Sequence, residues 1–188
     1  MPDLKLNPLT ALGHSAPVTE ALGPWTLTER ADVALASLAA RRGREAELAM
    51  AAQRAGVPLP PAARATDGSP YAAFWMTPEM WMVEAPFATH EDIRAHLLAA
   101  FADTASITEQ TDAWVRFDIA GPNLPRLFEK LSNFDLATAP DGAATRTVIE
   151  HMGCYLIKRS STQVTVYGAR SSAQSLHHAL HLAATTQA

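Results

Sequence analysis

The chain has 188 residues, of which 48% are hydrophobic and 18% are charged, and it carries a formal net charge of −4. This length allows a substantial core, and this composition is typical of a globular protein, so general disorder is excluded. The acidic balance and the absence of a Lys/Arg cluster argue against a nucleic-acid partner.

The N-terminus and the cysteine content bear on where the protein works. Residues 1–17 contain three prolines and lack the continuous apolar core of a secretory signal, and the apolar runs elsewhere are far shorter than the ~20 residues of a membrane span. Cys154 is the only cysteine, which rules out an intrachain disulfide and a multi-cysteine metal cage. We therefore expect a cytoplasmic protein without a membrane anchor.

The first predicted elements are an arm and two short strands. Residues 1–23 mix Pro, Gly, Ser and Thr without periodicity, which indicates an extended N-terminal arm. Residues 25–29 and 32–38 alternate apolar and polar side chains, as strands do. Residues 44–54 are rich in Ala, Glu, Leu and Met and are followed by Gly56, which predicts a helix and its end.

A proline-rich loop and an aromatic hairpin come next. Residues 57–70 contain four prolines and therefore form a connecting loop. Residues 71–85 contain two apolar runs around Pro78, which predicts a strand, a tight turn and a second strand. Its aromatic and methionine side chains favour either the core of the hairpin or a contact with a partner protein. The candidate partner contacts are Trp75, Met80, Trp81 and Met82.

The rest of the chain repeats the order of strands followed by a helix. A helix is predicted from Thr89 to residue 102, with Asp92 completing a variant capping box. The later strands are expected at residues 105–110, 113–119, 145–151, 155–159 and 163–167, and the later helices at residues 124–131 and 171–184. The predicted fold class is α+β, with two similar lobes of antiparallel sheet covered by helices, at residues 24–104 and 105–188, that form one compact unit.

Two clusters could be read as reactive sites, and each has a plainer interpretation. His177 and His181 lie four residues apart on one helical face beside His178, but two ligands are too few for a metal, so a solvated or partner-facing helix is favoured. Cys154 and His151 are three residues apart on a predicted strand and point to opposite faces. A buried structural cysteine is therefore the better interpretation.

The sequence offers no recognisable catalytic motif. It contains no G-x-S-x-G, no P-loop and no G-x-G-x-x-G. The carboxylates at strand ends and turns are expected to be solvated, and they do not form an evident acid–base pair; they are Glu79, Glu84, Asp118, Asp135 and Glu150. We therefore predict no catalytic, cofactor-binding or metal-binding residue in this chain.

Several segments nevertheless carry a family likeness. The run FWMTPEMWMV at residues 74–83 resembles the strand–turn–strand signature of the gamma subunit of heterotetrameric sarcosine oxidase. Residues 117–136, with Gly121-Pro122 and Asp135-Leu136, resemble a pattern that this subunit shares with the aminomethyltransferase-like folate-binding fold. Residues 166–171 resemble the strand that precedes the last helix of the family. The likeness covers about residues 70–184, with departures at Thr77 and Met80.

The resemblance implies an accessory role inside a larger enzyme. It implies a complex that oxidatively demethylates sarcosine and passes the one-carbon unit to tetrahydrofolate, with active sites on other subunits. FAD, FMN, NAD, zinc and tetrahydrofolate would be held by those subunits, and this chain would bind none of them. Its partner would be the large, alpha-type subunit, with beta and delta subunits in the same complex.

Two alternatives stay open at this point. Gly153-Cys154-Tyr155 resembles part of the Lys-Gly-Cys-Tyr motif of folate-binding proteins that support iron–sulfur clusters, but Met152 stands where that motif has Lys. The other alternative is a stand-alone module that binds a small molecule in a folate-type cleft, although no pteridine anchor is evident in the sequence.

Overall fold

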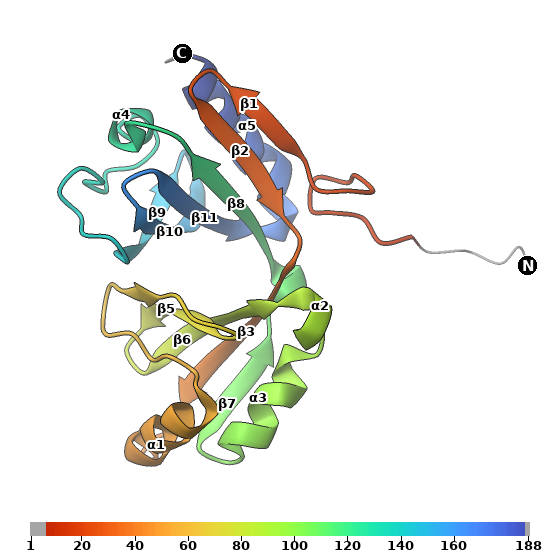
Figure 1. The fold of residues 1–188 in the computed structure, drawn as a ribbon, viewed down its shortest axis with the longest axis vertical. Helices are drawn as coiled ribbons and strands as arrows, with labels where there is room; N and C mark the ends of the chain where they lie inside the picture. The colour runs from red at the N-terminus through yellow and green to blue at the C-terminus, as the bar shows by residue number, and fades with distance from the viewer. Residues whose placement is uncertain (1–6, 187–188) are drawn as a thin grey trace, which may run out of the picture.

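The computed structural model describes residues 7–186, which form two antiparallel sheets with helices on their outer faces (Figure 1). The six-stranded sheet contains, in spatial order, β1 (Thr19–Leu22), β2 (Trp25–Arg30), β8 (Trp114–Ala120), β11 (Gln163–Ala169), β10 (Met152–Ser160) and β9 (Ala144–Ile149). The five-stranded sheet contains β4 (Ala65–Thr66), β5 (Ala72–Thr77), β6 (Met80–Pro86), β3 (Val33–Ala40) and β7 (Ala105–Glu109). The predicted α+β class with two helix-covered antiparallel sheets is confirmed.

The helices divide between the two sheets. The longer helices are α1 (Glu45–Ala55) and α3 (Ile93–Phe101) on the five-stranded sheet and α5 (Ala173–Thr185) on the six-stranded sheet. The shorter ones are α2 (Phe87–His90), α4 (Leu124–Phe128) and the 3₁₀ turns η1 (Thr111–Ala113) and η2 (Arg170–Ser172). Within residues 7–186, none of the helices is both long and apolar enough to cross a membrane.

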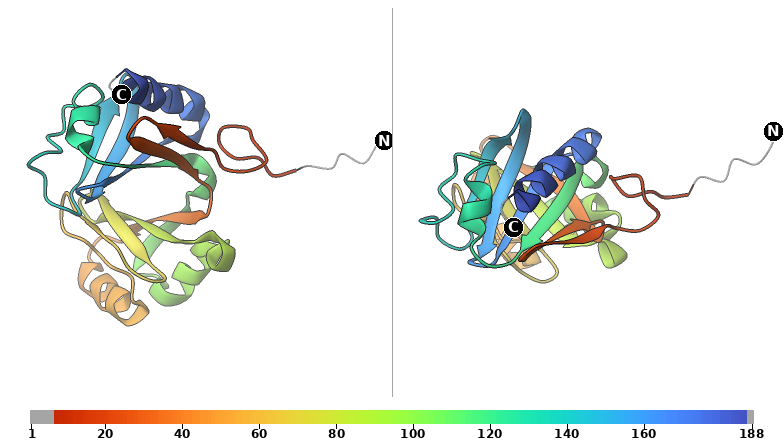
Figure 2. Two further views of the ribbon diagram at one scale, coloured as in Figure 1. Left: turned by 45° about the horizontal axis from the view of Figure 1, so that its top comes forward. Right: turned by 90° about the horizontal axis from the view of Figure 1, so that it is seen from above.

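Three apolar clusters make the molecule a sandwich of four layers. One lies between the six-stranded sheet and helices α4 and α5, and a second between the five-stranded sheet and helices α1 and α3. The third lies between the two sheets and includes Leu35, Phe74, Tyr155 and Tyr167. The central parts of β3, β6, β10 and β11 are therefore buried on both faces. Figure 2 shows the sheets stacked with the helices outside.

Strand periodicity explains which side chains reach each layer. In β6, Trp81 and Val83 belong to the helix-side cluster, whereas Met82 faces the other sheet. In β11, Val166 packs toward helix α5 and Tyr167 faces the other sheet. Because successive side chains in a strand alternate between faces, polar residues that share the spacing of Met82 and Tyr167 are also carried into the space between the sheets.

The sheets do not divide at the boundary expected between residues 104 and 105. Strand β2 belongs to the same sheet as β8, and β7 belongs to the same sheet as β3. The chain crosses between the sheets twice, at Ala31-Asp32 and again at residues 110–113. Each sheet therefore combines strands from both halves of the sequence, because pairing between distant strands leaves no mark in the local pattern.

The described part of the N-terminal arm packs on its own chain. Residues 19–22 form strand β1, which pairs with β2, and residues 1–6 lie outside the described residues. Before β1, the backbone N–H groups of Leu12 and Val18 donate to the buried Glu29 carboxylate at 3.0 and 3.2 Å. The expectation of an extended arm is therefore corrected for residues 7–23, because a buried carboxylate provides acceptors for this segment.

The helix predicted from Thr89 begins later than expected. Asp92 is the N-cap of α3, and its side chain accepts a hydrogen bond from the Ala95 N–H at 2.9 Å. Thr89 belongs to the separate short helix α2, where its hydroxyl donates to the Pro86 carbonyl. Asp92 thus accepts from one of the N–H groups that the first turn leaves without a helical partner, and the helix starts at Ile93.

Gly121 ends β8 in a position that excludes a side chain. Its φ is 148°, and a Cβ there would lie 2.6 Å from the Pro24 carbonyl oxygen and 2.7 Å from Cδ1 of Trp25. The indole N–H of Trp25 also donates to the Pro122 carbonyl at 2.7 Å. The Gly-Pro pair of the sequence motif therefore fixes the end of β8 against the start of β2.

Candidate binding site between the sheets

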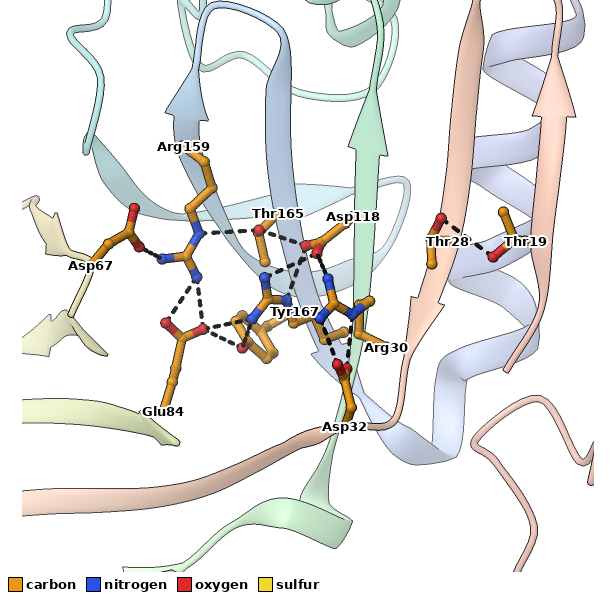
Figure 3. A network of polar contacts seen from close by, with 11 residues as sticks. Thr19, Thr28, Arg30, Asp32, Asp67, Glu84, Asp118, Arg159, Thr165 and Tyr167 are labelled. Atoms are coloured by element: carbon orange, nitrogen blue, oxygen red, sulfur yellow. Dashed lines mark hydrogen bonds and ion pairs between the residues drawn. The ribbon is translucent and has the colours of Figure 1, made fainter. Parts of the chain in front are cut away.

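A network of charged side chains joins the two sheets (Figure 3). It contains Arg30, Asp32, Asp67, Glu84, Arg116, Asp118, Arg159, Thr165 and Tyr167. Glu84 belongs to the five-stranded sheet and Asp67 to the loop between β4 and β5, whereas Arg116, Asp118 and Arg159 belong to the six-stranded sheet. We call this set the inter-sheet network.

The strands place these residues by register. Arg116 of β8 lies directly opposite Tyr167 of β11 on one side and Arg30 of β2 on the other. One pleat further along, Asp118 lies opposite Thr165. These side chains lie on the face of the sheet opposite helix α5, because they alternate with the residues that pack on that helix. They therefore face the other sheet in two rows, one with Arg116 and one with Asp118.

Arg159 enters the network because of an irregularity in its strand. The pairing of β10 with β11 shifts register between Lys158 and Ser160, with Arg159 at the shift. A bulge of this kind adds a residue and turns the local side chain in a new direction. The Arg159 side chain, with 9% of its surface exposed, thereby reaches Asp67 and Glu84 on the opposite side.

Glu84 is the acceptor at the centre of the network. Nη2 of Arg159 lies 2.7 and 2.9 Å from its two carboxylate oxygens, and Nη1 of Arg116 lies 3.3 Å from one of them. The Tyr167 hydroxyl donates to the same carboxylate. Glu84 is 4% exposed, so the buried charge is stabilised by two cations and a hydroxyl rather than by water.

Asp118 separates two arginines that would otherwise repel each other. Arg116 binds it through Nε and Nη2 at 2.9 and 3.0 Å, and Arg30 binds it through Nη1 at 3.1 Å. The Thr165 hydroxyl donates to it as well, at 2.7 Å. Like charges directly opposite on neighbouring strands are destabilising, so a shared carboxylate is needed for Arg30 and Arg116 to lie side by side.

The protonation states follow from these contacts. Burial alone would raise the pKa of Glu84, but the charges of Arg159 and Arg116 and the Tyr167 hydrogen bond hold that pKa below its ordinary value. Burial, and then the neighbouring Glu84 charge, raises the pKa of Tyr167 well above its ordinary value. At neutral pH the site therefore consists of fixed ion pairs and a neutral phenol, which suits binding better than proton transfer.

Two cavities flank the network. A cavity of about 310 Å³, which we call the arginine cavity, is lined by charged side chains and by the loop after β4. A second cavity of about 290 Å³ lies beneath residues 8–17 of the N-terminal arm. Arg30, Val33 and Arg116 line both cavities. Residues of the inter-sheet network therefore line two neighbouring cavities, each large enough for a small ligand.

The candidate partner contacts fall into two pairs. Trp81 and Met82 are 9% and 1% exposed, and the Trp81 indole N–H donates to the Pro60 carbonyl at 2.8 Å. They belong to the core of this chain, in agreement with the core interpretation of the hairpin, and offer little surface to a partner. Trp75 and Met80 are half-buried at the tip of the β5–β6 hairpin, so a partner contact there stays a prediction.

The carboxylates expected to be solvated also divide. Glu79, Asp135 and Glu150 are exposed, as predicted. Glu84 and Asp118 are buried, and the prediction for them was wrong. The prediction placed both carboxylates at strand ends or turns, whereas they lie within β6 and β8, which are covered on both faces.

Cys154 is buried as predicted, and it is separated from His151. Burial raises the pKa of the Cys154 thiol to about 11, so the thiolate needed for nucleophilic attack is scarce at neutral pH. His151 is exposed in the turn between β9 and β10. The two residues do not form a nucleophile and its base.

The terminal histidines contact the first strand. Nε2 of His177 and Nδ1 of His181 lie 3.2 and 3.0 Å from the same oxygen of Glu20. In residues 7–186 no group of three or more His, Cys, Asp or Glu side chains is arranged to hold a metal. These histidines therefore connect α5 to β1, which is a structural contact that the helix pattern alone did not predict.

Comparison with known proteins gives a fold relationship. No protein-family model matches the sequence, and no curated protein matches it. The structure superimposes on a chain of the heterotetrameric sarcosine oxidase from Corynebacterium sp. U-96 in complex with pyrrole 2-carboxylate. The TM-score is 0.76 and the identity 21%, over 89% of this chain and 87% of that one.

A second superposition extends the relationship. The glycine cleavage system aminomethyltransferase T from Bartonella henselae gives a TM-score of 0.60 at 9% identity, over 82% of this chain and 44% of that one. The chain therefore has the fold shared by these two proteins. It spans less than half of the aminomethyltransferase, but it matches the sarcosine oxidase chain over almost its full length.

Proposed function

We propose that this chain is the gamma-type accessory subunit of a heterotetrameric sarcosine oxidase, or of a related oxidase that acts on another N-methyl amine. The observation that carries the proposal is the superposition, over almost the full length of both chains, on a chain of such an oxidase. The sequence likeness at residues 74–83 and 117–136 supports it independently.

The proposed role is structural within the complex. Glu84 and Asp118 are neutralised by arginines, and Cys154 is a buried thiol, so these three groups are held in unreactive states. In this proposal the flavins, NAD, zinc and tetrahydrofolate are bound by other subunits. The chain would bind the large subunit, in an assembly that also contains beta and delta subunits, in the cytoplasm.

Co-expression with the alpha-, beta- and delta-type chains of its own genome tests this function. We expect the chain to co-purify with the large flavoprotein at one copy per complex, because an accessory subunit exists to occupy a fixed place in the assembly. The measurement is subunit stoichiometry by mass spectrometry of the intact complex. A chain that stays monomeric in the presence of the large subunit would refute the proposal.

Substitutions at the tip of the β5–β6 hairpin test whether that part of the chain contacts the large subunit. Replacing Trp75 or Met80 by Ala should weaken the association if these half-buried side chains contact the large subunit, since aromatic and methionine side chains are enriched at protein interfaces. Met50→Ala is the matched control, because Met50 is an exposed methionine, at 52%, that belongs to α1 and not to the hairpin.

A second candidate function is a stand-alone module that binds a folate-type ligand. The two cavities on either side of the inter-sheet network favour it, since each is of a volume suited to part of a small ligand. Titrating the isolated chain with a reduced folate in a calorimeter tests it. Tight binding in the absence of the other subunits would support this candidate, and an absence of heat would refute it.

A further inference from the structure

Two arginines of the arginine cavity share an unusual arrangement of partners. Each is held by one buried carboxylate and one exposed carboxylate. Arg159 binds the buried Glu84 and also Asp67, whose side chain is 73% exposed. Arg30 binds the buried Asp118 and also Asp32, whose side chain is 64% exposed. Both arginines and both exposed carboxylates line the same cavity.

The buried contacts keep the guanidinium groups in place independently of the exposed ones. Nη2 of Arg159 binds both oxygens of Glu84, and its Nε donates to Thr165 at 3.2 Å. Nη1 of Arg30 binds Asp118. The other donor groups of the two arginines bind the exposed carboxylates: Nη1 of Arg159 binds Asp67, and Nε and Nη2 of Arg30 bind Asp32.

The exposed carboxylates mark positions where the protein stabilises an anion. Asp32 binds Arg30 in the two-point geometry that suits a carboxylate, at 2.8 and 2.6 Å, and this hydrogen bonding lowers the pKa of Asp32. Nη1 of Arg159 lies 2.7 Å from Asp67. An ion pair whose acid is exposed to water contributes little to stability, so either carboxylate can be displaced at small cost.

We propose that the arginine cavity binds a small aliphatic dicarboxylate, whose two carboxylate groups replace Asp32 on Arg30 and Asp67 on Arg159. The cavity volume of about 310 Å³ accommodates such a molecule. Val33, Pro70 and Ala72 also line this cavity and offer apolar contact to the carbon chain between the two charges. The displaced aspartates turn into water, and the buried ion pairs of Glu84 and Asp118 stay as they are.

Isothermal titration of the isolated full-length chain with malonate, succinate, glutarate and adipate tests the proposal. Chloride at matched ionic strength controls for salt effects, and acetate controls for a single carboxylate. We expect saturable 1:1 binding with an optimum at one chain length, because two fixed guanidinium groups define one spacing. Heats that match chloride, or that do not vary with chain length, would overturn the proposal.

Substitution of the displaced carboxylates gives the most specific result. Asp67→Asn and Asp32→Asn should each tighten binding of the best dicarboxylate several-fold, because each removes an internal competitor for an arginine. Asp103→Asn is the matched control: it removes the same charge from an exposed Arg44 ion pair outside the cavity lining and should leave the affinity unchanged. Equal tightening by all three variants would indicate net charge alone and would refute the proposal.

Substituting an arginine of the cavity should weaken dicarboxylate binding instead of tightening it. Arg30→Lys keeps the charge but loses the two-point geometry, so we expect affinity to fall by about tenfold. The aspartate variants keep the buried ion pairs intact and remain decisive even if this variant folds poorly. Binding to the isolated chain is measured without any partner, so its failure leaves the accessory-subunit proposal unaffected. Wild-type affinity in Arg30→Lys would contradict the assigned contact.

Discussion

Replacing Glu84 by Gln is expected to lower the free energy of unfolding by about 3 kcal/mol, even though the side chain keeps its size. Removing one member of a buried ion pair leaves its partner charged and poorly compensated, at a cost of roughly 3–5 kcal/mol. The lower end applies because Arg116 keeps Asp118 and Arg159 keeps Asp67. Denaturant titration at neutral pH, with the midpoint and slope measured for both proteins, gives this difference.

The control for this variant is the other acid on the same arginine. Asp67→Asn removes an equal charge from Arg159, but Asp67 is largely exposed, so a loss of about 0–1 kcal/mol is expected. If Glu84→Gln cost no more than Asp67→Asn, the carboxylate of Glu84 would not hold the two sheets together. The comparison therefore separates burial of the charge from its mere presence.

The difference in the free energy of unfolding between wild type and Glu84→Gln should also depend on pH. The pKa of Glu84 in the folded chain lies below its ordinary value of 4.5, so the unfolded chain binds the proton more readily. The contribution of the Glu84 charge is then fully present above pH 4.5 and is lost as the pH falls through the lower, folded value. Wild type and Glu84→Gln should converge in stability on acidification, and a constant gap would contradict the ion-pair explanation.

Local sequence pattern was sufficient to predict most elements of this fold. The helix at residues 44–54 was predicted from composition and a following glycine, and α1 lies at Glu45–Ala55. The hairpin around Pro78 was predicted from two apolar runs, and β5 and β6 lie there. These features depend on neighbours in sequence, which is the information that periodicity and turn chemistry contain.

The pairing of strands and the inter-sheet network depend on contacts that no local pattern records. Arg30 and Arg159 reach the same network from distant strands, and the crossing of the chain at Ala31-Asp32 determines which sheet each strand joins. One signal was nevertheless available. In β8 the apolar residues Val115, Phe117 and Ile119 alternate with Arg116 and Asp118, so the polar face of that strand carries opposite charges two residues apart.

In an antiparallel sheet such an alternation usually means that one face is buried and the other is solvated. The same pattern is compatible with two buried faces when the polar one carries mutually compensating charges. Only the position of the second sheet distinguishes the two cases. The apolar cluster between the sheets sets that position, and in it the rings of Phe74 and Tyr167 stack with their centroids 5.3 Å apart. The site was therefore unpredictable until both sheets were assembled.

Replacing Trp81 by Ala is expected to lower the free energy of unfolding by about 3–5 kcal/mol, as is usual for a large aromatic removed from a core. Its ring is part of the cluster between the five-stranded sheet and helices α1 and α3, and its N–H donates to the Pro60 carbonyl of the proline-rich loop.

Trp75→Ala is the matched control on the neighbouring strand. Trp75 pairs with Trp81 in register but is half-buried, so a smaller loss is expected. Thermal and denaturant unfolding of the isolated chain measure both. A Trp81→Ala chain with an unchanged melting midpoint that no longer assembles with the large subunit would instead assign this side chain to the interface, against its 9% exposure here.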